Sequence, residues 1–365
     1  MTLNKKYCGR ISLVAMSALS AMAIGHEPAM AKPLYEAHPI VLNGMTAVEA
    51  YAINNRGQVT GYAYTDPTKY SAFLYNFRTN SGVTGGDLDA GIGYGINDKS
   101  EIVVSKSGSA YKYFSGAIEN IGYPGMLTIP EDINNKGAVA GYYYNTSSIA
   151  RAFLYSNGER SDLGTLGGDF SIAYGINSKN EVVGTSSNGA AFTSKAFLYS
   201  NGAMVDIFPN LSGSSVAAEI NNHGDIVGWG QFSQGITNQG FAIRNDNLDV
   251  FGGPETRARD INEKGVVVGE SSNKAFVYFR GMYNLNNISI KPEGWTITHA
   301  TGINDSGLIT AFGFNERGAR VSMILSPVTP VPEPSAYITM AAGLVIIGAT
   351  VKRATTNQKK GKTAP

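Results

Sequence analysis

The chain has 365 residues, of which 44 are glycine and 14 are proline. Glycine at about 12% exceeds the usual fraction of about 7%, but glycine and proline together stay below the level that marks low-complexity disorder. Charged residues make up 16%, the formal net charge is +1 and there is one cysteine. These values exclude a disulfide-stabilised scaffold and argue against nucleic acid as a partner.

Residues 1–31 predict an export signal. Three basic residues precede an uncharged, mostly apolar run at residues 11–24, which is too short to cross a bilayer comfortably. Ala29 and Ala31 form an Ala-x-Ala cleavage site; an earlier site at residues 21–23 and retention as a membrane anchor are the alternatives. The cysteine, Cys8, lies in this segment, so the mature chain would contain none, as suits an oxidising compartment.

The C-terminal end has a distinct organisation. A proline-rich linker at residues 327–335 is followed by an apolar run and a basic tail within residues 336–365. The residues that carry a recognisable motif are Pro332, Glu333, Pro334 and, after the apolar run, Arg353. This order resembles the PEP-CTERM sorting signal, which implies recognition and removal by an exosortase-type enzyme at the cell envelope. A plain transmembrane tail anchor is the alternative.

The two ends conceal the charge of the region between them. They hold eight of the 29 basic residues and two of the 28 acidic ones, which leaves 21 basic and 26 acidic residues, a net charge of −5. A mildly acidic surface favours solubility and argues further against polyanionic partners such as nucleic acid.

Residues 32–326 contain seven copies of one repeat. The dipeptide Ile-Asn occurs at Ile53-Asn54, Ile96-Asn97, Ile133-Asn134, Ile176-Asn177, Ile220-Asn221, Ile261-Asn262 and Ile303-Asn304. Glycine follows three residues after the Asn in five copies, and Ser100 and Asn180 take its place in the others. This Asn-x-x-Gly sequence predicts a tight hairpin with a left-handed residue at the glycine position, which Asn also tolerates.

Each repeat predicts four short strands. After the first hairpin come a β-rich run, then Ala-Phe-Leu-Tyr or a variant of it, then an Asn-Gly turn into a fourth strand, as at Asn157-Gly158 and Asn201-Gly202. Four strands in about 42 residues is typical of a propeller blade. The fold class is therefore predicted to be all-β, a seven-bladed β-propeller.

The strand count also predicts how the ring closes. The seventh repeat ends after three strands, whereas an extra strand at residues 35–42 precedes the first Ile-Asn. We expect this N-terminal strand to complete the last blade. An open β-solenoid, the alternative, would carry distinct caps at both ends instead.

The clearest repeat resembles a known family. It contains Ala-Phe-Leu-Tyr at 152–155, Asp-Leu-Gly-Thr-Leu-Gly-Gly at 162–168, Ala-Tyr-Gly-Ile-Asn at 173–177 and Val-Val-Gly at 182–184. This pattern is similar to the HAF repeat of bacterial extracellular proteins. The resemblance implies an extracellular repeat protein and no particular chemistry.

No residue pattern predicts catalysis, a cofactor or a metal site. His38, His223 and His299 lie in different repeat contexts without a second ligand at metal-binding spacing. Asp87 and Asp89 form only part of a calcium loop. The other carboxylates recur at equivalent repeat positions, which favours a structural role. The chain is therefore expected not to be an enzyme.

Aromatic residues give the one indication of a binding surface. The second strands and the loops after them carry Tyr62, Tyr64, Tyr142, Tyr143, Tyr144, Trp229 and Phe232. Equivalent positions would gather them on one face of the ring, where aromatic rings suit sugars; packing between blades is the alternative.

These patterns favour an exported structural or interaction protein, with exopolysaccharide or another envelope component as its partner. Two alternatives stay open. One is a lectin-like exopolysaccharide binder, which needs exposed aromatic side chains. The other is a glycan hydrolase or lyase, which needs paired carboxylates that face the axis.

Overall fold

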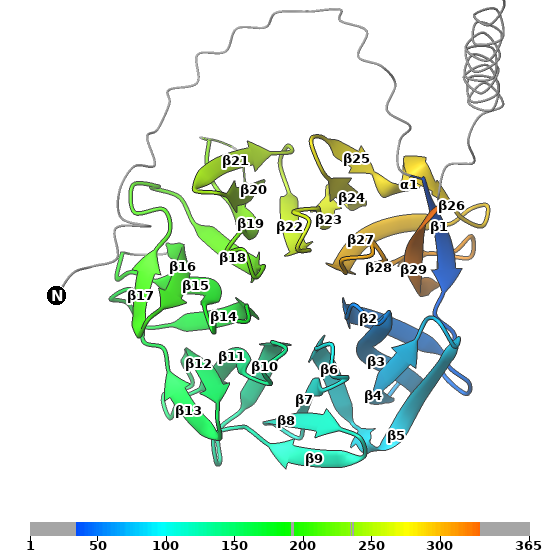
Figure 1. The fold of residues 1–365 in the computed structure, drawn as a ribbon, viewed down its shortest axis with the longest axis horizontal. Helices are drawn as coiled ribbons and strands as arrows, with labels where there is room; N and C mark the ends of the chain where they lie inside the picture. The colour runs from blue at the N-terminus through cyan, green and yellow to red at the C-terminus, as the bar shows by residue number, and fades with distance from the viewer. Residues whose placement is uncertain (1–33, 191–192, 234, 236, 329–365) are drawn as a thin grey trace, which may run out of the picture. The chain divides into compact units, whose positions relative to one another are not determined.

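The computed structural model describes residues 34–190, 193–233, 235 and 237–328. Seven sheets surround a central axis, so the predicted seven-bladed β-propeller is confirmed (Figure 1). Six sheets have four strands, and the seventh has five because a two-residue strand pairs in parallel at its outer edge. The predicted signal peptide, the Pro-Glu-Pro motif and the apolar run after it lie outside the described residues. Among the helices of the described part of the chain, none is long and apolar enough to cross a membrane.

The strands of each blade run outward from the axis in chain order. The innermost strands are β2 (Ala47–Ile53), β6 (Gly91–Ile96), β10 (Thr128–Ile133), β14 (Ser171–Ile176), β18 (Ser215–Ile220), β22 (Thr256–Ile261) and β27 (Thr296–Ile303). The second strands are β3 (Gln58–Asp66), β7 (Ile102–Lys106), β11 (Val139–Tyr144), β15 (Val182–Ser187), β19 (Ile226–Gly230), β23 (Val267–Ser271) and β28 (Ile309–Phe314).

The third and fourth strands form the outer half of each blade. The third strands are β4 (Lys69–Asn76), β8 (Ser109–Phe114), β12 (Ala150–Ser156), β16 (Ser194–Ser200), β20 (Gln239–Arg244), β24 (Lys274–Tyr278) and β29 (Arg320–Val328). The fourth strands are β5 (Ser81–Asp89), β9 (Ala117–Asn120), β13 (Glu159–Asp162), β17 (Ala203–Asp206), β21 (Asn247–Phe251), β25 (Met282–Asn284) and, in the seventh blade, β1 (Leu34–Pro39). A short helix α1 (Leu285–Ile288) and strand β26 (Ser289–Ile290) follow β25.

The N-terminal strand closes the ring, as the strand count predicts. In the seventh sheet β1 lies beside β29, in the order β26-β1-β29-β28-β27. The Ile40 N–H donates to the carbonyl oxygen of Ser322 at 3.0 Å, and the side chains of Tyr35, Ile40 and Leu42 are buried. The last blade therefore contains both ends of the propeller.

The first hairpin of every blade has the predicted chemistry. Oδ1 of Asn54 accepts from the N–H groups of Arg56 and Gln58 at 3.0 and 2.9 Å, and the six equivalent Asn side chains make the same two bonds. Gly57 has φ +75°, while Ser100 and Asn180 hold φ +67° and +60° at the same position. A positive φ there is what the turn requires.

The Ala-Phe-Leu-Tyr motif builds the core between blades. Its phenylalanines are among the largest fully buried side chains: Phe73, Phe153, Phe197, Phe241 and Phe276. The glycine of the second strand makes room for them, because a Cβ at Gly184 would lie 2.0 Å from the Ile172 carbonyl oxygen and 2.8 Å from the Phe197 ring. The Ala-Phe-Leu-Tyr motif and the glycine of the second strand therefore both serve core packing.

Candidate functional site

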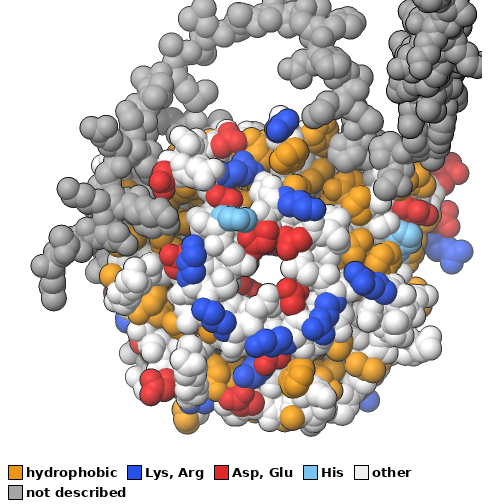
Figure 2. Space-filling model, viewed as in Figure 1, with side chains coloured by type: hydrophobic (Ala, Val, Ile, Leu, Met, Phe, Trp, Pro, Cys, Tyr) orange, Lys and Arg blue, Asp and Glu red, His pale blue; other side chains and the backbone are white. Residues whose placement is uncertain are grey.

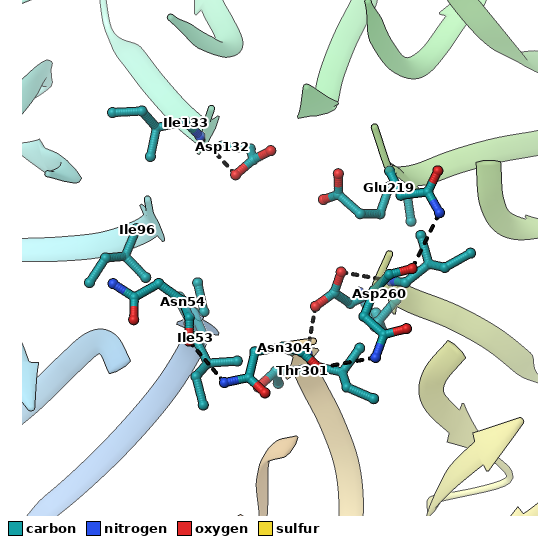
Figure 3. Close-up of a pocket in the computed structure, with 18 of the residues that line it drawn as sticks. Ile53, Asn54, Ile96, Asp132, Ile133, Glu219, Asp260, Thr301 and Asn304 are labelled. Atoms are coloured by element: carbon teal, nitrogen blue, oxygen red, sulfur yellow. Dashed lines mark hydrogen bonds between the residues drawn. The ribbon is translucent and has the colours of Figure 1, made fainter. Parts of the chain in front are cut away.

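A cavity of about 690 Å³ runs along the axis of the ring. The innermost strands of all seven blades line it, and Figure 3 shows Asp132, Glu219 and Asp260 pointing into the opening. Its volume lies within the range of about 300–1,000 Å³ that is usual for ligand sites. The cavity is therefore the candidate functional site.

One β-bulge in each innermost strand aims a side chain at the cavity. The register shifts at the same place in every blade, for example between Gly93 and Gly95 in β6. The residues at the bulges all line the cavity, and they are Tyr51, Tyr94, Glu131, Tyr174, Ala218, Arg259 and Thr301. A bulge re-aims a side chain that regular pleating would turn away, so the fold presents a ring of seven variable positions.

The next residue in each strand forms a second ring. Its members are Ala52, Gly95, Asp132, Gly175, Glu219, Asp260 and Gly302. Asp132 accepts from the N–H of Ile133 at 2.7 Å and from that of Ile176, in the next blade, at 3.0 Å. Asp260 bridges to Ile303 of its next blade in the same way, at 2.6 Å. These carboxylates therefore join neighbouring blades.

A closed ring of seven asparagines lies at the end of the innermost strands. The Nδ2 of each Ile-Asn asparagine donates to the main-chain carbonyl of the Asn in the next blade, at 2.8 to 3.3 Å, and Asn304 completes the ring on Asn54 at 2.9 Å. All seven side chains are buried. We call this set the asparagine ring; it joins every pair of adjacent blades.

The turns around the asparagine ring carry charges of both signs. The residue two positions after each Asn is exposed, and these residues are Arg56, Lys99, Lys136, Lys179, His223, Lys264 and Ser306. Figure 2 shows basic side chains around the central opening with carboxylates at its rim. Asp98, Glu263 and Asp305 are the acidic residues next to the ring. The mixture does not favour a ligand of either charge.

Carboxyl groups in the cavity have raised pKa values. Burial, with a contribution from Asp132, raises the pKa of Glu131 to about 8. Burial likewise raises the pKa of Asp260 to about 7 and that of Asp132 to about 6, although main-chain N–H bonds oppose the rise. The pKa of Glu219 also lies well above its usual range, because of burial and the nearby Asp132 and Asp260.

These shifts predict that the protein is more stable in mild acid than in mild alkali. Between about pH 4 and pH 8 the folded protein binds more protons at these carboxyl groups than the unfolded chain, so the free energy of unfolding falls as pH rises. Burial lowers the pKa of His299, which acts in the opposite direction below about pH 6.5. Replacement of Glu131→Gln should raise the free energy of unfolding by about 4 kcal/mol at about pH 8.5 and by less than about 1 kcal/mol near pH 5.

Thermal unfolding of the variant at the two pH values measures this effect. Glu119→Gln is the matched control, because a hydrogen bond from Tyr155, with help from Lys112, lowers the pKa of Glu119. That variant should lose stability at about pH 8.5, where Glu131→Gln gains it. Equal pH dependence in wild type and Glu131→Gln would contradict the assignment.

The other end of the cavity is lined by aromatic side chains. Tyr51, Tyr94 and Tyr174 stand at bulges, and Trp229 and Phe312 come from the second strands. Trp229 pairs with Val216 and Phe312 with His299, near the starts of their innermost strands, so these rings lie away from the asparagine ring. We call these five residues the aromatic mouth. All five are half-buried, so part of each ring is open to the cavity.

Arginine–glutamate pairs stand among these rings. Arg259 binds Glu270 through Nε and Nη2, at 2.7 to 3.1 Å, and its guanidinium lies 5.3 Å from the centre of the Trp229 ring. Arg320 pairs with Glu49 at 2.8 Å and lies 4.2 Å from the centre of the Phe312 ring. On this side of the aromatic mouth, guanidinium groups therefore lie against aromatic rings in cation–π contacts.

The predicted binding residues divide into three groups. Trp229 lines the cavity. Tyr62, Tyr64, Tyr142 and Tyr144 are half-buried and pack edge to face beside it, with Tyr62 5.7 Å from Tyr51. Phe232 instead packs with Phe208 and Phe241 in the core, and Tyr143 is buried with its hydroxyl on Asp162.

Most cavity residues were not predicted from the sequence. Five of them lie in the two positions before Ile-Asn, for which the repeat pattern predicts no role: Tyr51, Tyr94, Glu131, Tyr174 and Arg259. One feature of the sequence could have indicated them. The residue two positions before each Ile-Asn isoleucine varies among the repeats, whereas the Ile-Asn that follows it is constant.

The histidines lie apart, as their repeat contexts indicate. His38 contacts Ser326, His223 pairs with Glu263, and His299 stacks on Phe312. Asp89 accepts from the Ser71 hydroxyl at 2.8 Å. Within the part of the chain that the structure describes, no group of three or more His, Cys, Asp or Glu side chains is arranged to hold a metal ion.

Comparisons with known proteins identify the fold and no family. No family model matches the chain, and no curated protein matches it. The β-propeller domain of the Trilobed protease from Pyrococcus furiosus is similar in structure, at 8% identity over 82% of this chain and 97% of that chain, with a TM-score of 0.57. That domain has an open velcro topology, whereas β1 closes the last blade here.

Two further solved structures are more distant. TolB from Acinetobacter baumannii is 11% identical over 74% of this chain and 64% of that chain, with a TM-score of 0.46. YCF48 bound to a D1 peptide is 11% identical over 83% of this chain and 99% of that chain, with a TM-score of 0.47. The likeness to the Pyrococcus furiosus domain shows a propeller fold alone.

Proposed function

We propose that this propeller is an exported interaction protein that binds a polysaccharide at the aromatic mouth. The observation that carries the proposal is the set of half-buried rings at the bulges, Tyr51, Tyr94 and Tyr174, which face one cavity together with Trp229. Aromatic faces pack against the apolar faces of sugar rings, while phenol and guanidinium groups bind hydroxyls.

The tyrosines remain neutral across the physiological pH range. Burial, with a smaller effect of Glu131, raises the pKa of Tyr174 to about 12, and burial also raises the pKa values of Tyr94 and Tyr51. A neutral phenol both donates and accepts a hydrogen bond. The three tyrosines therefore offer sugar-binding groups that carry no charge.

The test is polysaccharide binding by tyrosine variants of the full chain. Tyr94→Ala and Tyr174→Ala should each weaken binding about 5- to 10-fold, because each removes one aromatic contact from the cavity. Isothermal titration with bacterial exopolysaccharide and its oligosaccharides measures the change.

Tyr283→Ala is the matched control, since this half-buried tyrosine lies in the outermost strand β25. It should bind as the wild type does. Unchanged binding by both cavity variants, with folding verified by their melting curves, would reject the aromatic mouth as the site.

A glycan hydrolase is the second candidate function. Glu131 favours it, because a carboxyl group in the cavity with a pKa near 8 is protonated at neutral pH and suits a general acid. The binding function is preferred, because Asp132 and Asp260, which would supply the partner carboxylate, are held by main-chain N–H groups. Release of new reducing ends from a bound polysaccharide, abolished by Glu131→Gln, would reverse the preference.

We also propose export and envelope sorting through the two ends of the chain. The support is the sequence itself: a signal peptide at residues 1–31 and a PEP-CTERM-like segment with Pro332, Glu333, Pro334 and Arg353. Deletion of residues 332–353 should change both the cellular location and the mature size, because an exosortase-type enzyme would no longer process the chain. Fractionation and immunoblotting measure both, and an unchanged location and size would reject the proposal.

A further inference from the structure

Three arginines gather on one side of the aromatic mouth. Arg259 and Arg320 line the cavity, and Arg257 lies over the ring of Trp229, which also lines it. All three lie near enough to His299 to affect its pKa, and we call them the arginine sector. Their side chains are 44%, 38% and 39% exposed. The sector therefore presents guanidinium groups to whatever enters.

The carboxylates that pair with these arginines lie behind them. Glu270 serves both Arg257 and Arg259, at 4.0 and 2.7 Å, and its side chain is 6% exposed. Glu49 pairs with Arg320, and its side chain is 10% exposed. Three guanidinium groups thus face two carboxylates, which leaves one positive charge uncompensated on the open side.

Aromatic rings hold the guanidinium groups in place. Arg320 lies over Phe312, which in turn stacks on His299 with 4.5 Å between ring centres. Arg257 and Arg259 lie over Trp229, at 5.7 and 5.3 Å. Because these contacts order the side chains before any ligand arrives, a bound anion would meet a preorganised site.

Tyr94, Tyr174 and Glu131 do not repel an anion in the cavity, and main-chain N–H groups bind the carboxylates of Asp132 and Asp260. Tyr94 and Tyr174 are neutral, and burial raises the pKa of Glu131 to about 8, so this carboxyl group is protonated at neutral pH. Arg259 meets Glu270 through Nε and Nη2, and Arg320 meets Glu49 through Nη1. A guanidinium has five N–H donors, so each arginine can bind a ligand carboxylate as well, and guanidinium N–H groups fit a carboxylate closely.

We infer that the arginine sector selects an acidic polysaccharide, one whose sugar units carry carboxylate groups. The carboxylate binds the open side of the three guanidinium groups, and the sugar rings pack against the tyrosines. This inference rests on the proposed polysaccharide binding and adds the class of ligand. The cavity tyrosines favour a glycan over an acidic peptide. Binding of an acidic peptide is therefore one of the outcomes that the test distinguishes.

The test compares acidic polymers with neutral polymers of the same backbone. Titration of the full chain with polygalacturonate and alginate should show at least 10-fold tighter binding than titration with their carboxyl-reduced counterparts. The preference should shrink as salt is added, because the attraction between exposed charges is screened.

Two arginine variants assign the preference to the sector. Arg257→Gln leaves Glu270 paired with Arg259, and Arg320→Lys keeps the charge that faces Glu49 while it removes the guanidinium fork. Each should weaken binding of the acidic polymers about 5- to 10-fold and leave the reduced polymers within about twofold. Arg280→Gln is the control, since Arg280 lies over Phe279 outside the cavity and should change neither.

The other outcomes separate this inference from the proposed function. Equal binding of acidic and reduced polymers, with loss in Tyr94→Ala, would overturn the acidic preference and leave polysaccharide binding intact. Binding of neither class would overturn both. Polyglutamate bound as tightly as polygalacturonate, without any effect of Tyr94→Ala, would overturn the inference in favour of an acidic peptide.

Discussion

Removal of residues 34–42 is expected to abolish the cooperative unfolding transition of the propeller. This segment supplies strand β1 and the buried side chains of Tyr35, Ile40 and Leu42. Burial of each such side chain stabilises a fold by about 1.5–3 kcal/mol, and the strand hydrogen bonds to β29 add to this. The total approaches the whole stability of a typical domain, about 5–15 kcal/mol.

Calorimetry and far-ultraviolet circular dichroism measure the loss. A chain that begins at Lys32 is the control, because it lacks the predicted signal peptide and keeps β1; it should melt as one cooperative transition. A synthetic peptide of residues 32–44, added to the shorter chain, should restore part of the transition. If the shorter chain melts like the control, β1 does not lock the ring.

Asn304→Ala should cost about 3 kcal/mol in the free energy of unfolding. The Asn304 side chain caps its own turn through two main-chain N–H groups and donates to the Asn54 carbonyl across the seam between the last and first blades. It is 3% exposed. Loss of three buried hydrogen bonds, each worth about 1 kcal/mol net, gives this figure.

Asn315 provides a matched control within the same blade. Its side chain caps a turn through the N–H groups of Arg317 and Ala319, at 3.0 and 2.9 Å, with no bond to another blade among the described residues. Asn315→Ala should therefore cost about 1 kcal/mol. Asn304→Asp keeps the turn but sets a carboxylate oxygen against the buried Asn54 carbonyl, so it should cost at least as much as Asn304→Ala. Equal costs at Asn304 and Asn315 would mean that the asparagine ring adds nothing between blades.

The sequence was sufficient to predict the fold because the repeat encodes local geometry. Asn-x-x-Gly and Asn-Gly specify their turns within four residues, and the missing strand of the seventh repeat specifies the closure. For the same reason, the sequence could predict that Oδ1 of Asn304 caps its own turn. It could not predict that Nδ2 donates to the Asn54 carbonyl, since Asn54 is 250 residues away and becomes a neighbour only when the ring closes.

The candidate site was less predictable because bulges break the alternation of a strand. In a regular strand, side chains alternate between the two faces of the sheet, so the sequence alone does not direct Tyr94 or Tyr174 to the axis. The register shift at each of these residues turns its side chain toward the cavity. The aromatic pattern of the second strands includes Trp229, which lines the cavity. It failed to distinguish Phe232, which follows the end of β19 and turns back into the core.

The most direct test of the account is a crystal structure of the full chain with an oligogalacturonate. We expect the sugar within the axial cavity, with its rings against Tyr94 and Tyr174 and a carboxylate on the arginine sector. Sugar bound only at the outer strands or at the turns around the asparagine ring would contradict it.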